Sequence, residues 1–324
     1  MALDTPERPT RIVAADEDGI EQGGKLLREG RLIAFPTETV YGLGANALDE
    51  DAVAAIFAAK ERPRFNPLIV HVRDFEAARE LVQFNGTATA LAEAFWPGGL
   101  TLVLPRREPC PLALLVSGGL STAAIRAPAH PIARSLVEAA GVPIAAPSAN
   151  RAGRISPTSA ADAADELQGR VDLILDGGPC PLGIESTVIG FDGENPILLR
   201  PGAIPRDDIE DLIGRLLDPD GAVVQASGMM ASHYAPRARL RLNAKMVEAG
   251  EALLAFGSEP LAGARIVRNL SASGNLREAA ANLFSMLRLL DKTGAETIAV
   301  MPIPVSGLGE AINDRLARAS APRK

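Results

Sequence analysis

Short apolar segments that end at proline or at small polar residues alternate along this chain with segments of helical period. The apolar segments are too short for buried helices and are typical of strands covered on both faces. Strands are expected at residues 11–14, 31–35, 67–72, 100–104, 122–126, 142–146, 171–175, 186–191, 197–199, 252–256, 264–267 and 297–301. Helices are expected at residues 16–29, 49–60, 75–82, 87–95, 131–140, 156–167, 207–217, 276–290 and 311–319. This alternation predicts an α/β protein built on a mainly buried sheet.

The stretch 31–46 combines one such strand with an unusual connection. Residues 31–35 form the apolar run, and Pro36 ends it because proline has no N–H to donate to a neighbouring strand. Small polar residues and glycines follow, among them Thr37, Glu38 and Thr39. In open α/β sheets such strand ends are where ligands bind. We therefore interpret residues 36–46 as a ligand loop; an ordinary strand-to-helix connection is the alternative that spacing alone leaves open.

The chain is long enough for two domains, each with its own core. Residues 218–238 carry several turn residues and no sustained period, which is typical of a linker. We expect a catalytic domain at 1–217, an interdomain linker at 218–238 and a small Rossmann-like domain at 239–324. The last segment lacks the GxGxxG fingerprint, so dinucleotide binding there is not supported.

Charge and cysteine usage narrow the class of protein. The net charge of −7 disfavours stable binding of RNA or DNA and leaves only a local basic cleft open. The two cysteines, Cys110 and Cys180, have no CxxC spacing, which argues against a disulfide framework or a zinc site and favours a reducing compartment. Residues 1–8 lack the features of a signal peptide, and no apolar run approaches the length of a membrane span. We expect a cytoplasmic protein.

Motifs of several enzyme classes are missing. The sequence has no GxxxxGK[ST] phosphate loop, no HExxH and no GxSxG, and its three histidines lie far apart. Metal-dependent hydrolysis and serine hydrolysis are therefore disfavoured.

Four separated cations lie at or just beyond apolar runs: Lys60, Arg62, Arg126 and Arg200. Buried cations are costly unless an anion joins them, and a triphosphate can share its charge between arginine forks and a lysine. This set favours an anion-binding cleft. The alternative pairs the arginines with Glu38, Glu185 or surface aspartates.

Several motifs in chain order resemble those of the YrdC family. They are FPTETVYGLGA (35–45), KERP (60–63) with NPL (66–68), WPG (96–98) with LT (100–101), RAP (126–128), APSAN (146–150), EST (185–187) and LRPG (199–202). HYAP (233–236) and GLGEAINDR (307–315) resemble the longer, two-domain branch of that family. Two positions depart from the family pattern, because Gly99 and Ser227 stand where prolines are usual.

The resemblance implies a threonylcarbamoyl-AMP synthase, which combines L-threonine, bicarbonate and ATP and releases pyrophosphate. The product would feed the threonylcarbamoylation of adenosine 37 in tRNA, through transient contact with the downstream transferase machinery. The implied fold is a twisted, open, mixed sheet with a concave basic cavity, followed by a small Rossmann-like domain. Stable nucleic-acid or membrane partners are not expected.

The same motifs imply roles for individual residues. Lys60, Arg62 and Arg126 are the expected catalytic residues, with Lys60 close to the phosphates. Threonine and its carbamate are expected to contact Thr39, His71, Arg126, Ser148 and Ser186. The expected nucleotide contacts are Arg62, Asn66, Thr122, Ala146 (through its backbone), Ser156, Arg200 and Tyr234. Mg²⁺ would accompany the triphosphate through its oxygens rather than through protein ligands, and the linker around Tyr234 would act as a lid.

Two other functions compete with this one. Carbamoyl-adenylate formation in hydrogenase maturation uses a YrdC-like domain together with zinc-binding cysteine motifs, which two cysteines cannot supply. An RNA-binding module could use the same basic cavity, but the overall acidity and the lack of interleaved aromatic residues count against it.

Overall fold

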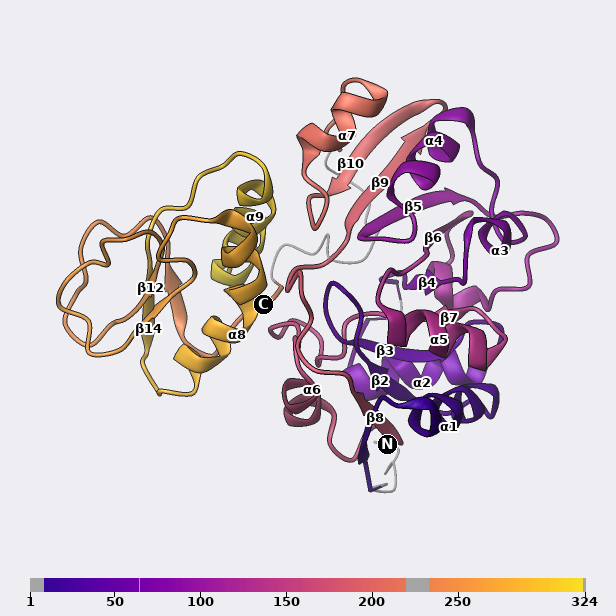
Figure 1. The fold of residues 1–324 in the computed structure, drawn as a ribbon, viewed down its shortest axis with the longest axis horizontal. Helices are drawn as coiled ribbons and strands as arrows, with labels where there is room; N and C mark the ends of the chain where they lie inside the picture. The colour runs from indigo at the N-terminus through magenta and orange to yellow at the C-terminus, as the bar shows by residue number, and fades with distance from the viewer. Residues whose placement is uncertain (1–8, 64, 220–232, 323–324) are drawn as a thin grey trace.

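The computed structural model describes residues 9–63, 65–219 and 233–322, and it contains two separate sheets (Figure 1). Within this described part, the first sheet has ten strands and the second has four. Across the first sheet the strands are β1 (Arg11–Ala14), β8 (Leu173–Asp176), β2 (Ile33–Phe35), β3 (Gly42–Asn46), β7 (Ile144–Ala145), β4 (Ile69–His71), β6 (Thr122–Arg126), β5 (Leu100–Pro105), β9 (Thr187–Asp192) and β10 (Asn195–Arg200). Parallel pairs such as β4–β6 and antiparallel pairs such as β5–β6 both occur, so the sheet is mixed as expected.

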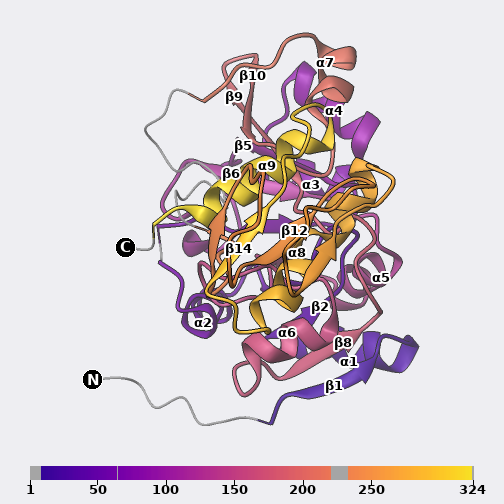
Figure 2. The same cartoon turned by 90° about the vertical axis from the view of Figure 1, so that its left-hand side faces the viewer.

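The second sheet is parallel throughout its described pairs. Its order is β11 (Arg239–Arg241), β14 (Thr297–Val300), β12 (Ala252–Ala255) and β13 (Val267–Asn269). The helices α8 (Leu276–Asp291) and α9 (Leu308–Ser320) lie between this sheet and the first part of the chain, and Figure 2 shows the second part in front of the first. The predicted class, an α/β domain followed by a small Rossmann-like one, is confirmed.

Side chains that accept hydrogen bonds from free backbone N–H groups fix where most helices begin. The helices of the first part are α1 (Glu17–Arg28), α2 (Glu50–Lys60), α3 (Phe75–Arg79), α4 (Gly86–Phe95), α5 (Pro131–Ala140), α6 (Ala160–Leu167) and α7 (Arg206–Ile213), with a 3₁₀ turn, η1 (Leu114–Ser117). Asp49 caps α2, its side chain accepting from the backbone N–H groups of Asp51 and Ala52. Ser159 caps α6, so the prediction that this helix begins at 156 was wrong. Pro157, which precedes the cap, is not part of the helix: its carbonyl accepts a hydrogen bond from the backbone N–H of Tyr41.

The interpretation of residues 36–46 as a loop was wrong in its second half. Gly42–Asn46 forms β3, which pairs antiparallel with β2 and also with β7. Glycine and asparagine are poor strand formers, which hides the strand in the sequence. The glycine is needed for packing, because a Cβ on Gly44 would lie 2.8 Å from the Phe35 ring and 3.0 Å from Ile144. The polar connection is therefore a tight link between two buried strands.

One apolar cluster joins the two parts of the chain. Buried residues of the first part, among them Val40, Ile155 and Ile184, belong to the same cluster as Phe284 of α8 and Ile312 of α9. The second domain thus packs, through α8 and α9, on the surface of the first domain that contains Val40, Ile155 and Ile184. No helix in the described ranges is long and apolar enough to cross a membrane.

Candidate functional site

Strand ends of the first sheet bring several polar side chains together. The strands β4 and β6 run parallel, and their register pairs His71 with Arg126 at the last residue of each. Thr39 lies in the link between β2 and β3, and Ser186 precedes β9. Arg200 ends β10, which runs antiparallel to β9, so Arg200 returns to the side of Ser186.

These residues surround a small space that we call the inner cavity. Its volume is about 30 Å³. Eight of the expected site residues line it: Thr39, His71, Arg126, Ala146, Ser148, Ser186, Arg200 and Tyr234. Thr37, Glu185 and His233 line it as well.

Arg126 is held at the cavity by a buried network. Its Nη2 lies 2.7 Å from Oε1 of Glu38, its Nη1 donates to Oγ1 of Thr39 at 2.9 Å, and its Nε donates to the Gly98 carbonyl at 3.0 Å. Glu38 also accepts from the backbone N–H groups of Ala129 and His130. Burial raises the pKa of Glu38, but the charge of Arg126 and the hydrogen bond from Ala129 outweigh it and bring that pKa to about 2. Glu38 is thus an ionised partner that orients Arg126 toward the cavity.

A second network holds Ser186. Its hydroxyl lies 2.8 Å from Oγ1 of Thr101, and Arg200 donates both to its carbonyl (2.8 Å) and to its hydroxyl (3.1 Å). Burial lowers the pKa of Arg200, and the nearby Arg315 lowers it further. An anion beside Arg200 would relieve both effects.

His71 faces the same space as a neutral imidazole. Burial lowers its pKa to about 3, and the charge of Arg126 acts in the same direction. Its Nδ1 is buried and has no hydrogen-bond partner in the described part of the chain. Such an atom is a ready contact for a polar ligand group.

The rings of His233 and Tyr234 reduce the size of the inner cavity. Both residues are buried, with ring centroids 3.9 Å apart. Tyr234 stacks on Phe284 of α8, and the guanidinium of Arg315 from α9 lies 5.2 Å from its ring centroid. The Tyr234 hydroxyl is buried without a hydrogen-bond partner among the described residues. Residues 220–232 of the expected linker, Ser227 included, lie outside the described residues.

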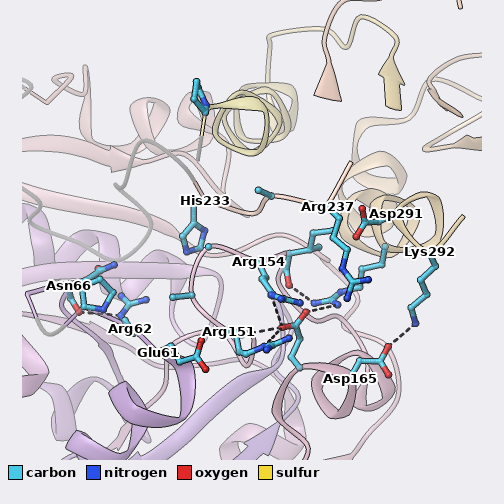
Figure 3. Close-up of a pocket in the computed structure, with 18 of the residues that line it drawn as sticks. Glu61, Arg62, Asn66, Arg151, Arg154, Asp165, His233, Arg237, Asp291 and Lys292 are labelled. Atoms are coloured by element: carbon cyan, nitrogen blue, oxygen red, sulfur yellow. Dashed lines mark hydrogen bonds and ion pairs between the residues drawn. The ribbon is translucent and has the colours of Figure 1, made fainter. Parts of the chain in front are cut away.

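A second, larger space lies between the two domains, and we call it the outer cavity (Figure 3). Its volume is about 930 Å³. Arg62 and Asn66 line it, and His233 lines both cavities. Arg62 donates to the carbonyls of Asn66 (3.3 Å) and Pro67 (3.1 Å), and burial lowers its pKa to about 10.

Three expected site residues line neither cavity. Lys60 is buried, and its ammonium donates to the carbonyls of Ser148 and Asn150, which lowers its availability for a phosphate. Ser156 donates to Oε1 of Glu185 at 2.5 Å. Thr122 is the first residue of β6, which runs parallel to β4. It therefore lies at the same end of the sheet as Asn66, which precedes β4 and is another expected nucleotide contact. Thr122 lines neither cavity.

The alternative that the arginines pair with Glu38 or Glu185 holds in part. Arg126 pairs with Glu38, whereas Glu185 pairs with Arg315 at 2.7 Å, a residue of the second domain that we did not select. Arg315 also donates to the Pro201 carbonyl at 3.0 Å. Only the motif at 307–315 could have pointed to it.

Carboxylates at the inner cavity are already engaged. Glu38 and Glu185 are each bound to an arginine. Within the described ranges, no three His, Cys, Asp or Glu side chains come together as a metal site. This donor set fits a cation that arrives with its own phosphate ligands better than one held by protein oxygens.

Comparisons with known proteins follow the same two-part division. A family profile described as "Telomere recombination" (Sua5/YciO/YrdC) matches residues 25–202, and a profile described as "Threonylcarbamoyl-AMP synthase, C-terminal domain" matches residues 204–321. The chain belongs to the Sua5/YciO/YrdC family. The resemblance inferred from the motifs is thereby confirmed.

Individual members of the Sua5/YciO/YrdC family match over almost their whole length. A threonylcarbamoyl-AMP synthase of Pyrococcus abyssi is 43% identical over 92% of this chain and 93% of its own. One of Bacillus subtilis is 40% identical over 97% and 96%. The crystal structure of P. abyssi Sua5 complexed with L-threonine has a TM-score of 0.89 at 41% identity, covering 96% of this chain and 98% of that one.

Proposed function

We propose that the inner cavity, together with the adjoining part of the outer cavity at Arg62 and Asn66, binds L-threonine, bicarbonate and ATP and joins them into threonylcarbamoyl-AMP, with release of pyrophosphate. The chain is a threonylcarbamoyl-AMP synthase, because relatives named for that activity match it at 40% identity or more over more than nine tenths of both chains. Its product supplies the threonylcarbamoyl modification of tRNA. We further propose that adenosine 37 is the modified base and that delivery uses transient contact with a downstream transferase.

The observation that carries this proposal is the orientation of Arg126, whose buried guanidinium lies at the wall of the inner cavity. Its guanidinium is fixed by Glu38 and Thr39 at the wall of the inner cavity. A planar fork held this way suits a carboxylate, so it would take the carboxylate of threonine. Thr39, His71, Ser148 and Ser186 line the same wall and would take the amine, hydroxyl and carbamate groups. The P. abyssi relative was solved with L-threonine bound, which supports this assignment.

The nucleotide would occupy the side of Arg62, Asn66 and Arg200. Arg200 lines the inner cavity and Arg62 the outer one, and His233 lies between the two cavities. The inner cavity is far smaller than the outer one, at about 30 against about 930 Å³, and we infer that the ring of Tyr234 moves aside to admit ATP. We propose that the segment carrying His233 and Tyr234 is the lid of the site. Thr122, Ser156 and the Ala146 backbone would complete the nucleotide side, and Lys60 would act by fixing the turn at Ser148.

The chemistry needs positioning more than it needs a dedicated nucleophile. The amine of threonine and bicarbonate give a carbamate with loss of water. A carbamate oxygen then attacks the α-phosphorus of ATP, and the bond to the β-phosphate oxygen breaks, so that pyrophosphate leaves. Arg62 and Arg200 would stabilise the charge that develops on the phosphates. A buried site protects the water-sensitive carbamate and adenylate.

Mg²⁺ would be held by the oxygens of the triphosphate, where it would neutralise charge on the leaving pyrophosphate. The engaged state of Glu38 and Glu185 supports this placement. We also propose the division into a catalytic domain (1–217), a linker (218–238) and a second domain (239–324). A cytoplasmic location remains our proposal, and both described cysteines are free.

A pyrophosphate-release assay with each substrate omitted in turn tests the activity. Release should require L-threonine, bicarbonate and ATP together. The variant Arg62→Ala should lose activity while its circular dichroism spectrum stays that of the parent. Release that persists without threonine or bicarbonate would refute the proposal.

A further inference from the structure

The outer cavity contains more cationic groups than the proposed nucleotide contacts account for. Six cationic and four carboxylate side chains line it. Three of the arginines, Arg151, Arg154 and Arg288, converge on the single carboxylate of Glu166, at 3.6, 4.0 and 3.2 Å. Arg288 also lies 3.9 Å from Asp162, but two carboxylates cannot neutralise three guanidinium groups, so the cavity wall keeps an excess of positive charge.

Three guanidinium groups in this cavity also have unused donors. Within the described residues, no side-chain N–H of Arg151, Arg154 or Arg237 donates a hydrogen bond. The Nε of Arg151 is buried without an acceptor. Arg288 differs, because it donates to Glu166 and to the Ile155 carbonyl. Guanidinium forks with open donors are suited to phosphate oxygens, which accept two parallel hydrogen bonds.

The position of these arginines relates them to the reaction. Figure 3 shows Arg62 and Asn66 on one side of His233 and Arg151, Arg154 and Arg237 on the other. His233 lines both cavities, so the outer space adjoins the inner one at this imidazole. A diphosphate leaving the inner cavity past Arg62 would reach these three arginines next.

We propose that the part of the outer cavity across His233 from Arg62 and Asn66 is a second anion site, which takes a diphosphate group through Arg151, Arg154 and Arg237. Pyrophosphate released by the enzyme is one source of that group, in which case the inference rests on the proposed function; the diphosphate of a free nucleotide is the other. A concave space of this size fits a small molecule. A nucleic-acid backbone is instead followed by an extended groove of basic residues.

Equilibrium dialysis of the full chain against labelled pyrophosphate tests the site. The parent should bind two equivalents. In the double variant Arg154→Gln/Arg237→Gln one of them should weaken by about tenfold or more, since the charge-assisted hydrogen bonds of two guanidinium groups are lost. Arg265→Gln is the matched control, because Arg265 is an exposed arginine of the second domain that lines neither cavity. It should bind as the parent does.

The variant Arg200→Gln distinguishes pyrophosphate binding at the inner site from binding at the outer site. This variant should lose the inner equivalent and keep the outer one. Displacement of the remaining pyrophosphate by ADP would identify a nucleotide as the source, and resistance to ADP would identify free pyrophosphate. An unchanged isotherm in the double variant, or loss of both equivalents in Arg200→Gln, would overturn the proposal. So would a double variant that loses affinity for tRNA but not for pyrophosphate.

Dialysis does not depend on turnover. If pyrophosphate release proved independent of threonine, the proposed function would fail while the outer site would still stand or fall on the binding data.

Discussion

At the scale of single residues, the inner cavity depends on a carboxylate that does not face the substrate. Glu38 binds Arg126 and two backbone N–H groups, and it is only 7% exposed. Its pKa of about 2 in the fold lies below the ordinary value of 4.5. The ionised form therefore stabilises the folded state, and protonation removes that stabilisation.

We expect Glu38→Gln to lower the free energy of unfolding at neutral pH. The lowered pKa corresponds to roughly 3 kcal/mol, present above the unfolded value of 4.5 and lost as the pH falls towards the folded value of about 2. Urea unfolding of the parent and of Glu38→Gln should thus give a difference that shrinks from pH 6 to pH 2. A difference that stays constant over this range would show that Glu38 is not the titrating group.

Arg126 should not tolerate replacement by lysine. The lysine keeps the charge but loses the fork that contacts Glu38, Thr39 and Gly98 at once. We expect kcat/KM for threonine to fall about hundredfold with the fold intact, the range found for disturbed buried charge contacts. Arg73→Lys is the control, because Arg73 is an exposed residue paired with the exposed Asp74; its kcat/KM should equal that of the parent. A smaller loss in Arg126→Lys would assign the carboxylate of threonine to another residue.

At the scale of elements, the β2–β3 hairpin brings Thr39 to the cavity. Its strands are buried and pack against each other without room for a side chain at Gly44. The link between them is held by Thr37, whose hydroxyl donates to the Val40 carbonyl at 2.7 Å and lies 2.8 Å from the Thr39 hydroxyl. The position of Thr39, the proposed threonine contact, is therefore set by strand packing.

We expect Gly44→Ala to destabilise the fold by roughly 1–3 kcal/mol, the usual cost of overpacking. The new methyl would lie 2.8 Å from Phe35. Gly86→Ala is the matched control, since a Cβ there meets nothing within 4 Å and residue 86 begins α4. It should be neutral or slightly stabilising. Thermal unfolding midpoints compare the two, and equal midpoints would contradict the packing argument.

Elements with a strong apolar or helical pattern could be predicted from the sequence, and the others could not. The strand at Thr122–Arg126 and the helix at Pro131–Ala140 lie where expected. The strand at Gly42–Asn46 was not predicted, because glycine has a low strand propensity and Gly44 is required here by close packing. Most of the residues that line the inner cavity could be predicted from the polar residues at the strand ends. The partner of Glu185 could not be predicted, since Arg315 meets it only after the second domain has packed against the first.

At the scale of the whole molecule, the second domain completes the wall behind the inner cavity. Arg315 of α9 is fully buried and binds Glu185, which in turn accepts from Ser156. Arg288 of α8 binds Glu166 of α6 in the same interface. Apolar residues of both domains form one cluster around these pairs. The contact thus links domain packing to residues of the proposed nucleotide side.

We expect Arg315→Met to cost about 3–5 kcal/mol, because it leaves Glu185 buried without its partner. Pyrophosphate release should fall with it, as Ser156 loses its fixed acceptor. Lys292→Met removes another ion pair between the domains, but Lys292 and Asp165 are largely exposed, so its cost should stay at or below about 1 kcal/mol. Equal unfolding free energies of the two variants would show that the buried pair adds nothing.

The pairing of Glu185 with Arg315 also determines when the wall behind the inner cavity can be completed during protein synthesis. The segments that contain Thr39, His71, Arg126 and Arg200 all leave the ribosome before α9 does. The first sheet can therefore form while Glu185 still lacks its cation. The ion pair behind the inner cavity forms only after residue 315 has emerged, so a transcript truncated ahead of α9 would yield a chain that has the proposed threonine contacts but leaves Glu185 without its partner.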